Sequence, residues 1–338
     1  MQNQQFTALV VDETPDKGIQ RRIEQKRLSS LPAGDVLVHV QYSSLNYKDA
    51  LSASGNRGVT KHFPHTPGID AAGIIVASDD PAWREGEEVL CTGYDLGMNT
   101  SGGFGQYIRV PANWLVRCPE GLSLLESMRL GTAGFTAGQC IWHLERNNIV
   151  PGRGPILVTG ATGGVGSIAI LLLHKLGYEI VAVTGKDSEH AFLTSLGATT
   201  VLKRDSFVAG SDKQLLPIRW QGVVDTIGGA ALAAAIKSTG FDGVVTCCGN
   251  AASGDLPISV YPFILRGVHL IGVYSANCPM EKRLQIWKKL AGDWKIEKLA
   301  AISRVVALEA LEGEIQAMLA GQSKGRCVVA LGGEVDVS

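Results

Sequence analysis

A short polar run near the start of the chain has the side chains that proton transfer requires. Four consecutive residues, Asn46, Tyr47, Lys48 and Asp49, supply an amide, a phenol, an ammonium and a carboxylate. They come soon after residues 36–41, where apolar and other residues alternate as in a strand. Such a density of proton-handling groups at a strand end is typical of an active-site wall, so Asn46, Tyr47 and Asp49 are the catalytic candidates. The alternative is a turn assisted by Asp and Asn side chains, with a half-buried tyrosine.

A glycine-rich stretch in the middle of the chain is the second candidate site. The apolar run Ile156–Val158 leads into the turn Thr159–Gly166, and the apolar residues 168–173 then predict a buried helix that stops near Gly177. A second strand at Glu179–Thr184 completes a βαβ unit. Ala161, Gly163 and Gly166 take the three glycine places of the dinucleotide fingerprint, which predicts a pyrophosphate at the start of the helix. The alternative is an ordinary tight turn.

The end of the second strand indicates which dinucleotide binds. NAD-binding chains carry an acidic residue there, which accepts hydrogen bonds from the ribose hydroxyls. This chain has Thr184, Gly185 and Lys186 instead, a hydroxyl and an ammonium that suit a 2′-phosphate. We therefore predict NADPH as the cofactor. The alternative for Lys186 is a solvated loop lysine.

Composition excludes several classes of protein. The chain has 338 residues, a formal net charge of −1 and 19% charged residues, which fits a globular protein of about two domains. Near-neutral charge argues against nucleic acid or a membrane surface as partner. The first residues lack the basic start and apolar run of a signal peptide, and no stretch approaches the ~20 apolar residues of a membrane span. A cytoplasmic location is expected.

Cysteine and histidine spacing predicts no metal site. The seven cysteines are an odd number without a Cys-x-x-Cys pair, so we expect free thiols and no four-cysteine zinc lobe. His62 and His65 are the one suggestive pair, but Pro64 and Pro67 place them on a loop.

The pattern of the chain predicts two domains and an α/β fold class. Short alternating strands and turns run to about Leu125, and strands alternating with helices follow from about Ser127, which implies a parallel sheet. An amphipathic helix is predicted at residues 281–290, with Lys282, Arg283, Lys288 and Lys289 as its polar residues. Residues 305–331 read as helix, glycine-containing turn and strand, and could close back onto the first domain.

The motifs together resemble the medium-chain dehydrogenase/reductase superfamily and, within it, the zinc-free acryloyl-CoA reductases, also labelled quinone oxidoreductases. Zinc-dependent relatives have Gly-His-Glu where this chain has Gly68, Ile69 and Asp70, so a metal ligand is replaced by an apolar side chain. The resemblance runs over nearly the whole chain. It rests on residues 43–51, 67–70, 131–137, 158–166, 172–178 and 262–266.

The resemblance implies a β-rich GroES-like catalytic domain, residues 1–126 completed by 300–338, and a Rossmann domain with a doubly wound parallel sheet, residues 127–299. It implies that NADPH lies in the cleft and that Arg204 stacks on the adenine or clasps the 2′-phosphate. Relatives often have arginine in place of Lys186, and an aspartate or asparagine in place of Tyr274. The residues it places at the cofactor are Tyr47, Thr162, Gly163, Gly164, Val165, Thr184, Gly185, Lys186, Arg204, Asn250, Ile264, Ser275 and Arg326.

The expected activity is NADPH-dependent reduction of the activated C=C bond of acryloyl-CoA to propionyl-CoA without zinc. Hydride would add to the β-carbon and a proton to the α-carbon, with Asn46 or Tyr47 stabilising charge on the thioester oxygen. The first alternative is an enzyme that reduces a quinone with NADPH. A distant third is a protein that binds NADPH without turnover. The apolar run Val268–Val273 would be a bare sheet edge, so a homodimer that pairs it with its copy is also expected.

Overall fold

The computed structural model describes residues 3–16, 18–333 and 335, and the chain forms two compact units. Unit 1 comprises Met1–Thr132, Ala276–Leu284 and Leu299–Ser338, and unit 2 comprises Ala133–Ser275 and Gln285–Lys298. The domain limits inferred from the sequence stay a prediction. Segment 276–284 belongs here to the unit that contains both ends of the chain.

Unit 2 is built on a six-stranded parallel sheet. Its strand order is β10-β9-β8-β11-β12-β13, so the order reverses between β8 and β11, where ligands of doubly wound sheets bind. This confirms the Rossmann prediction. The strands are β8 (Ile156–Val158), β9 (Ile180–Thr184), β10 (Thr200–Lys203), β11 (Trp220–Asp225), β12 (Thr239–Cys247) and β13 (His269–Gly272).

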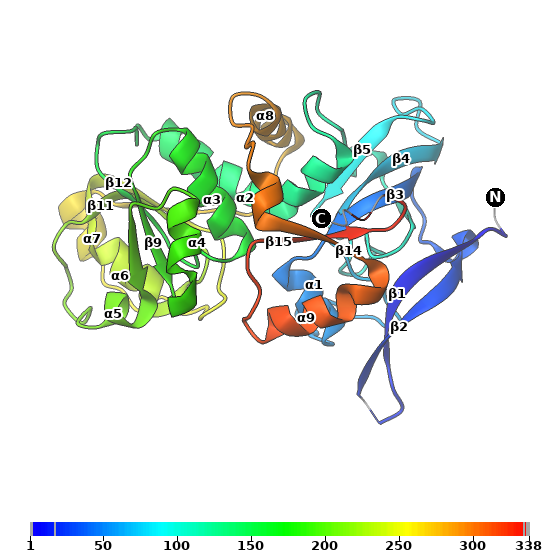
Figure 1. Ribbon diagram of the computed structural model, residues 1–338, viewed down its shortest axis with the longest axis horizontal. Coiled ribbons are helices and arrows are strands. Elements are labelled where there is room, and N and C mark those ends of the chain that lie inside the picture. Colours follow the sequence, from blue (N-terminus) through cyan, green and yellow to red (C-terminus); the bar gives the residue numbers. More distant parts are fainter. Residues whose placement is uncertain (1–2, 17, 334, 336–338) are drawn as a thin grey trace. The chain divides into compact units, whose positions relative to one another are not determined.

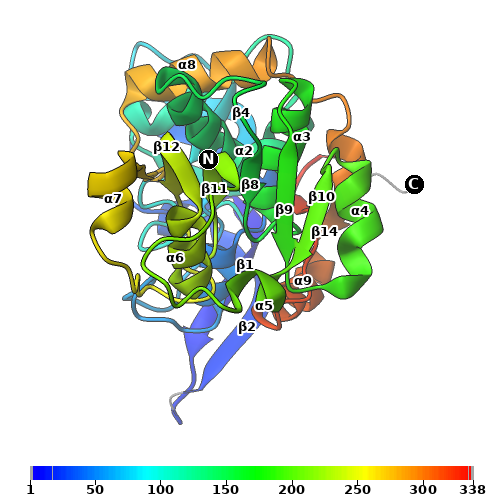
Figure 2. The same ribbon diagram turned by 90° about the vertical axis from the view of Figure 1, so that its left-hand side faces the viewer.

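Helices cover both faces of this sheet. Helices α3 and α4 lie on one side and α6 and α7 on the other, as right-handed crossovers require (Figure 2). The predicted helix after the glycine turn is α3, and its last turn closes at Gly177, which has a φ of +81°. The helices are α2 (Leu124–Arg146, kinked at Gly131 at the unit boundary), α3 (Gly164–Lys175), α4 (His190–Ser195), α5 (Arg204–Val208), α6 (Gly229–Lys237) and α7 (Tyr261–Arg266).

Unit 1 contains a seven-stranded sheet and a separate hairpin of β1 and β2 (Figure 1). As predicted, the end of the chain closes back onto it: β15 pairs with β14 in parallel and with β3 antiparallel. The path is β14-β15-β3-β4-β5-β7, with β6 paired to β3. The strands are β1 (Gln5–Glu13), β2 (Ile19–Arg27), β3 (Val36–Ser44), β4 (Asp70–Ser78), β5 (Glu88–Thr92), β6 (Tyr107–Val110), β7 (Leu115–Arg117), β14 (Ser303–Ala307) and β15 (Arg326–Ala330).

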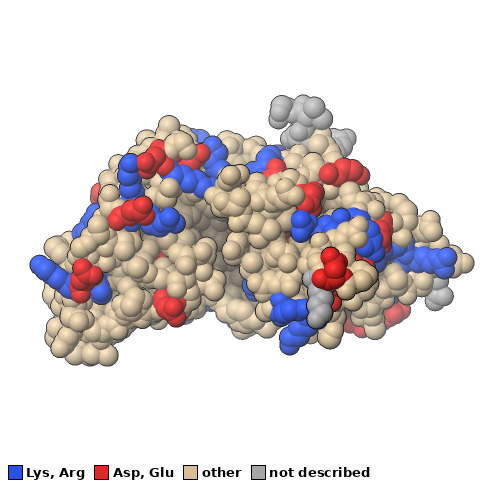
Figure 3. Space-filling model, turned by 90° about the horizontal axis from the view of Figure 1, so that it is seen from below, with Lys and Arg blue, Asp and Glu red and all other residues tan. Residues whose placement is uncertain are grey.

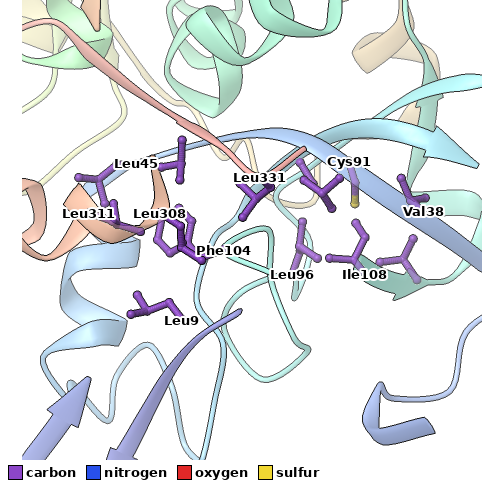
Figure 4. Packing of buried hydrophobic residues seen from close by; sticks show 14 of the residues in the cluster. Leu9, Val38, Leu45, Cys91, Leu96, Phe104, Ile108, Leu308, Leu311 and Leu331 are labelled. Carbon is purple, nitrogen blue, oxygen red and sulfur yellow. The ribbon is translucent and has the colours of Figure 1, made fainter. Parts of the chain in front are cut away.

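The core of unit 1 joins segments from both ends of the chain. Figure 4 shows Leu9, Phe104 and Ile108 with Leu308, Leu311 and Leu331 in one packed cluster. Its burial holds the first strands of the chain against the last. Helices α1 (Tyr47–Ala53) and α9 (Leu311–Leu319) contact each other beside the sheet.

Helix α8 (Met280–Ala291) confirms the predicted helix but corrects one of its residues. Arg283, assigned to the polar face, is fully buried. Its Nη1 donates to the carbonyl and hydroxyl oxygens of Thr92, its Nη2 donates to Ala276 O, and its guanidinium lies 4.6 Å from the ring centre of Tyr94. The guanidinium is tolerated in this buried position because these acceptors replace the water molecules that would otherwise accept its hydrogen bonds.

The surface carries both signs of charge. Lys and Arg side chains are interspersed with Asp and Glu on the face in Figure 3, in keeping with the near-neutral net charge. The seven cysteines are free thiols, as predicted. Within the described residues, no helix is long and apolar enough to cross a bilayer.

Candidate active site

The polar run of unit 1 is the start of a helix. Strand β3 ends at Ser44, Asn46 is the N-cap of α1, and the Asp49 carboxylate accepts the Asn46 backbone N–H at 2.8 Å. This is half of a capping box, which satisfies a backbone donor that a helix start otherwise leaves unpaired. The segment therefore has the Asn- and Asp-assisted geometry of the alternative, and its role as an active-site wall stays a prediction.

Asp49 is fully buried and joins two segments of the chain. Its Oδ1 accepts the backbone N–H groups of Gly68 at 3.2 Å and Ile69 at 2.8 Å. Burial, together with the neighbouring Asp70 carboxylate, raises the pKa of Asp49 to about 7. The Asp49 carboxylate is thus closed off from solvent and engaged by backbone N–H groups, and its predicted catalytic role stays a prediction.

Asp70 is a buried member of this cluster that the sequence analysis does not predict. It is fully buried at the start of β4, and its carboxylate accepts hydrogen bonds from Ser44 Oγ at 2.6 Å, Asn46 Nδ2 at 2.8 Å and Thr132 Oγ1 at 2.6 Å. The Thr132 backbone N–H donates to it as well, at 2.9 Å. The one signal in the sequence is its position at the end of the motif Gly68-Ile69-Asp70.

Arg326 completes this buried network. It was expected to face the cofactor, but it is 2% exposed and donates to the carbonyls of Arg129 and Leu45 and to Asn46 Oδ1, at 3.1, 3.3 and 3.2 Å. Its Nη2 lies 4.0 Å from Asp70 Oδ2. Burial lowers the pKa of the guanidinium from its ordinary value, and the Asp70 charge opposes that shift. In this arrangement Arg326 supports Asn46.

The network leaves Tyr47 and Lys48 as the exposed donors of the run. Asn46 Nδ2 donates inward to Asp70, Asp49 and the Ser44 carbonyl, so its hydrogens are already engaged. Tyr47 begins α1 and is 46% exposed. Of the three catalytic candidates, Tyr47 is therefore the one whose polar group lies on an exposed side chain.

The glycine turn of unit 2 has the geometry of a phosphate site. Gly160 has a φ of +59°, and a Cβ added to Gly166 would lie 2.4 Å from Gly160 O, so helix and turn pack too closely for a side chain. The backbone of α3 starts directly after Gly163. Its first N–H groups and the helix dipole favour an anion there. Four of the predicted cofactor residues form this start: Thr162, Gly163, Gly164 and Val165.

The end of β9 brings the predicted 2′-phosphate residues together. Thr184 is buried and its Oγ1 accepts the Lys186 backbone N–H at 3.0 Å. The Arg204 guanidinium packs over Gly185, where an added Cβ would lie 3.0 Å from Arg204 Cζ. Arg204 is half exposed and borders a cavity of about 390 Å³. The other residues that line this cavity are Asp205, Val208, Ala209, Ala230, Ala231 and Ala252.

The other predicted cofactor residues follow later strands. Asn250 comes after β12, and Ser275 follows β13. Ile264 lies on α7 and is 66% exposed. Their contacts with a cofactor stay predictions.

Comparisons with known proteins agree with this geometry. A family model for the alcohol dehydrogenase GroES-like domain matches residues 32–120, and one for the zinc-binding dehydrogenases matches residues 164–291. Acrylyl-CoA reductase AcuI of Ruegeria pomeroyi is 43% identical over 325 residues, 96% of this chain and 98% of that protein. The chain belongs to this family of medium-chain dehydrogenases/reductases. It is an oxidoreductase.

Two solved members of the family carry different nucleotides. A structure of Escherichia coli K-12 YhdH with bound NADPH has a TM-score of 0.93 and 42% identity, covering 96% of this chain and 99% of that one. A structure of Bacillus subtilis yhfP with NAD bound has a TM-score of 0.94 and 41% identity, covering 97% and 100%. The curated name of the Bacillus protein is "Putative quinone oxidoreductase YhfP".

Proposed function

We propose that this protein reduces acryloyl-CoA to propionyl-CoA with NADPH. The end of β9 supports NADPH as the cofactor, because Thr184 takes the place of an acidic residue there and Arg204 packs over Gly185. A guanidinium suits a 2′-phosphate because its planar fork can donate two hydrogen bonds to it. The name of the Ruegeria relative supports the substrate.

The residues of unit 1 supply the proton side of the reaction. When bound, NADPH supplies the hydride that the β-carbon of the thioester accepts. The Tyr47 hydroxyl donates a proton to the α-carbon, directly or after stabilising charge on the thioester oxygen. Asn46, Asp49, Asp70 and Arg326 hold the first turn of α1 in place through their mutual hydrogen bonds.

Zinc has no role in this proposal. Ile69, in the position where zinc-dependent relatives have a histidine, is an apolar side chain that is 5% exposed. It cannot ligate a metal, although the family model over unit 2 is named for zinc-binding dehydrogenases.

A homodimer remains part of the proposal. Strand β13 is an edge strand of the unit 2 sheet, and Leu270 on it is 37% exposed. Pairing β13 with its copy in a second chain would satisfy the backbone groups of that edge.

The direct test is the rate of NADPH oxidation with acryloyl-CoA and with a quinone, each at matched concentrations. The proposal expects a much higher kcat/KM with acryloyl-CoA. A higher kcat/KM with the quinone would support quinone reduction, the second candidate function, which the name of the Bacillus relative favours. Tight NADPH binding without turnover of either substrate would contradict both.

A further inference from the structure

The ends of β8 and β11 are fastened to each other by buried side chains. Thr159 follows β8, and its hydroxyl donates to Asp225 Oδ1 at the end of β11, at 2.6 Å. The same hydroxyl oxygen accepts the Thr226 backbone N–H at 3.1 Å. Thr226 Oγ1 in turn donates to Thr159 O at 2.9 Å. Thr159 and Asp225 have no exposed surface, so these bonds form without competition from water.

Asp225 extends this fastening to the next two turns. Its Oδ2 accepts the Gly228 backbone N–H at 2.9 Å, just before α6. Its backbone carbonyl accepts the Cys248 N–H at 3.0 Å, where β12 ends. One carboxylate residue therefore ties together the turns that follow β8, β11 and β12.

The fastened turn after β8 is the one that opens α3. A Cβ added to Gly160 would lie 2.1 Å from Thr226 Oγ1, and Gly163 N donates to Gly160 O at 3.0 Å. A change at Thr159 or Thr226 therefore moves Gly160 and, through it, the first N–H groups of α3. Those N–H groups can bind a pyrophosphate only when they converge on it.

We infer that Thr159, Asp225 and Thr226 are positioning residues for the dinucleotide, because they set the shape of the phosphate turn. This inference rests on the proposed use of NADPH. The three residues act through the backbone of the turn. Asp225 is needed as an acceptor, and its inward hydrogen bonds to Thr159 and Gly228 keep the carboxylate pointed away from solvent.

The test separates positioning from general stability by using two ligands, NADPH and adenosine 2′-monophosphate. The second ligand has the 2′-phosphate but lacks the pyrophosphate. Thr159→Val removes the hydroxyl while keeping the shape of the side chain. We expect its Kd for NADPH to rise about tenfold, as loss of well-placed phosphate hydrogen bonds would give, while its Kd for adenosine 2′-monophosphate stays unchanged.

Three further variants sharpen the comparison. Thr159→Ser keeps the hydroxyl and should bind NADPH like wild type. Thr239→Val is the matched control, because Thr239 is also buried in this sheet and donates to Ala235 O at 2.8 Å, at the start of β12 and so at the end of the strand opposite the turns. It should leave both Kd values unchanged. If Thr159→Val does not fold, Thr226→Val removes the hydrogen bond to Thr159 O and should give the same selective loss.

An unchanged Kd for NADPH in folded Thr159→Val or Thr226→Val would overturn the inference. So would an equal loss for both ligands, which would indicate a general effect on the unit. Wild-type protein that binds adenosine 2′-monophosphate but not NADPH would instead overturn the proposed function on which the inference rests.

Discussion

The two candidate sites of this chain are built in opposite ways. In unit 2 the groups that would meet the cofactor are backbone N–H groups at the start of α3, the partly buried Lys186 after β9 and the half-exposed Arg204 after β10. In unit 1 the polar groups turn inward: Asn46, Asp49, Asp70 and Arg326 form one hydrogen-bonded network, and among the catalytic candidates of the polar run Tyr47 alone is about half exposed.

This difference separates groups that act on a ligand from groups that position them. An exposed cation costs little desolvation free energy on folding, and it contributes little to stability unless a ligand binds to it. Buried charges are costly to desolvate and must be paired, so removing one leaves its partner unsatisfied. Mutations in unit 2 should therefore change binding, whereas mutations in the buried network should change stability.

The largest effect is expected at Tyr47. Tyr47→Phe removes the proton donor while keeping the ring, so kcat should fall by about 10²–10⁴ with little change in the KM for NADPH. Steady-state kinetics with acryloyl-CoA measures both. A kcat near that of wild type would assign the proton to water and leave the unit 1 site without a catalytic side chain.

Arg326→Ala should be the most destabilising of the arginine replacements. It leaves Asp70 buried without its cation and should lower the free energy of unfolding by about 3–5 kcal/mol in urea. Arg204→Ala is the matched control, since Arg204 is half exposed and should change stability by less than about 0.5 kcal/mol. Equal losses in the two variants would contradict the distinction between the two regions.

The raised pKa of Asp49 gives the stability a pH dependence. Its pKa moves from 3.8 in the unfolded chain to about 7 in the folded one, so between these values the folded protein holds a proton that the unfolded chain has released. Stability from this group is therefore complete below pH 4 and is lost as the pH rises toward 7, with a slope of at most about 1.4 kcal/mol per pH unit.

Asp49→Asn isolates this contribution from that of other titrating groups. The difference in unfolding free energy between wild type and Asp49→Asn should change across pH 4–7. A difference that stays constant with pH would mean that Asp49 titrates in the folded protein as it does in the unfolded chain.

The smallest effect concerns the choice of nucleotide. Arg204→Ala should raise the KM for NADPH about tenfold and leave that for NADH unchanged, because only NADPH carries the 2′-phosphate. Comparable use of NADH and NADPH by wild-type protein would contradict our account of the β9 end. The NAD-bound structure of the Bacillus relative makes this comparison informative.

The sequence predicted unit 2 better than unit 1, for a physical reason. The phosphate turn is contiguous, and the places of Ala161, Gly163 and Gly166 in it follow from local rules for strand, turn and helix. The buried network joins residues 46–49, 70, 132 and 326, which only the folded sheet brings together. Without these contacts, the sequence gives no reason to choose Asp70 over the other acidic residues as a member of the network.

The burial of charged side chains could not be predicted from the sequence. Arg283 and Arg326 were assigned to a polar helix face and to the cofactor cleft, yet both are almost fully buried. Their burial depends on carbonyl acceptors such as Thr92 O and Arg129 O, which are far away in the sequence. Helical periodicity and motif matching contain no information about such distant acceptors.

Isotope transfer tests the proposed reaction most directly. NADPH deuterated at the transferring C4 position should give propionyl-CoA with one deuterium at the β-carbon, and the same reaction run with unlabelled NADPH in heavy water should place deuterium at the α-carbon. Mass spectrometry and NMR of the product locate each label. Consumption of NADPH without deuterium at the β-carbon of propionyl-CoA would contradict the account.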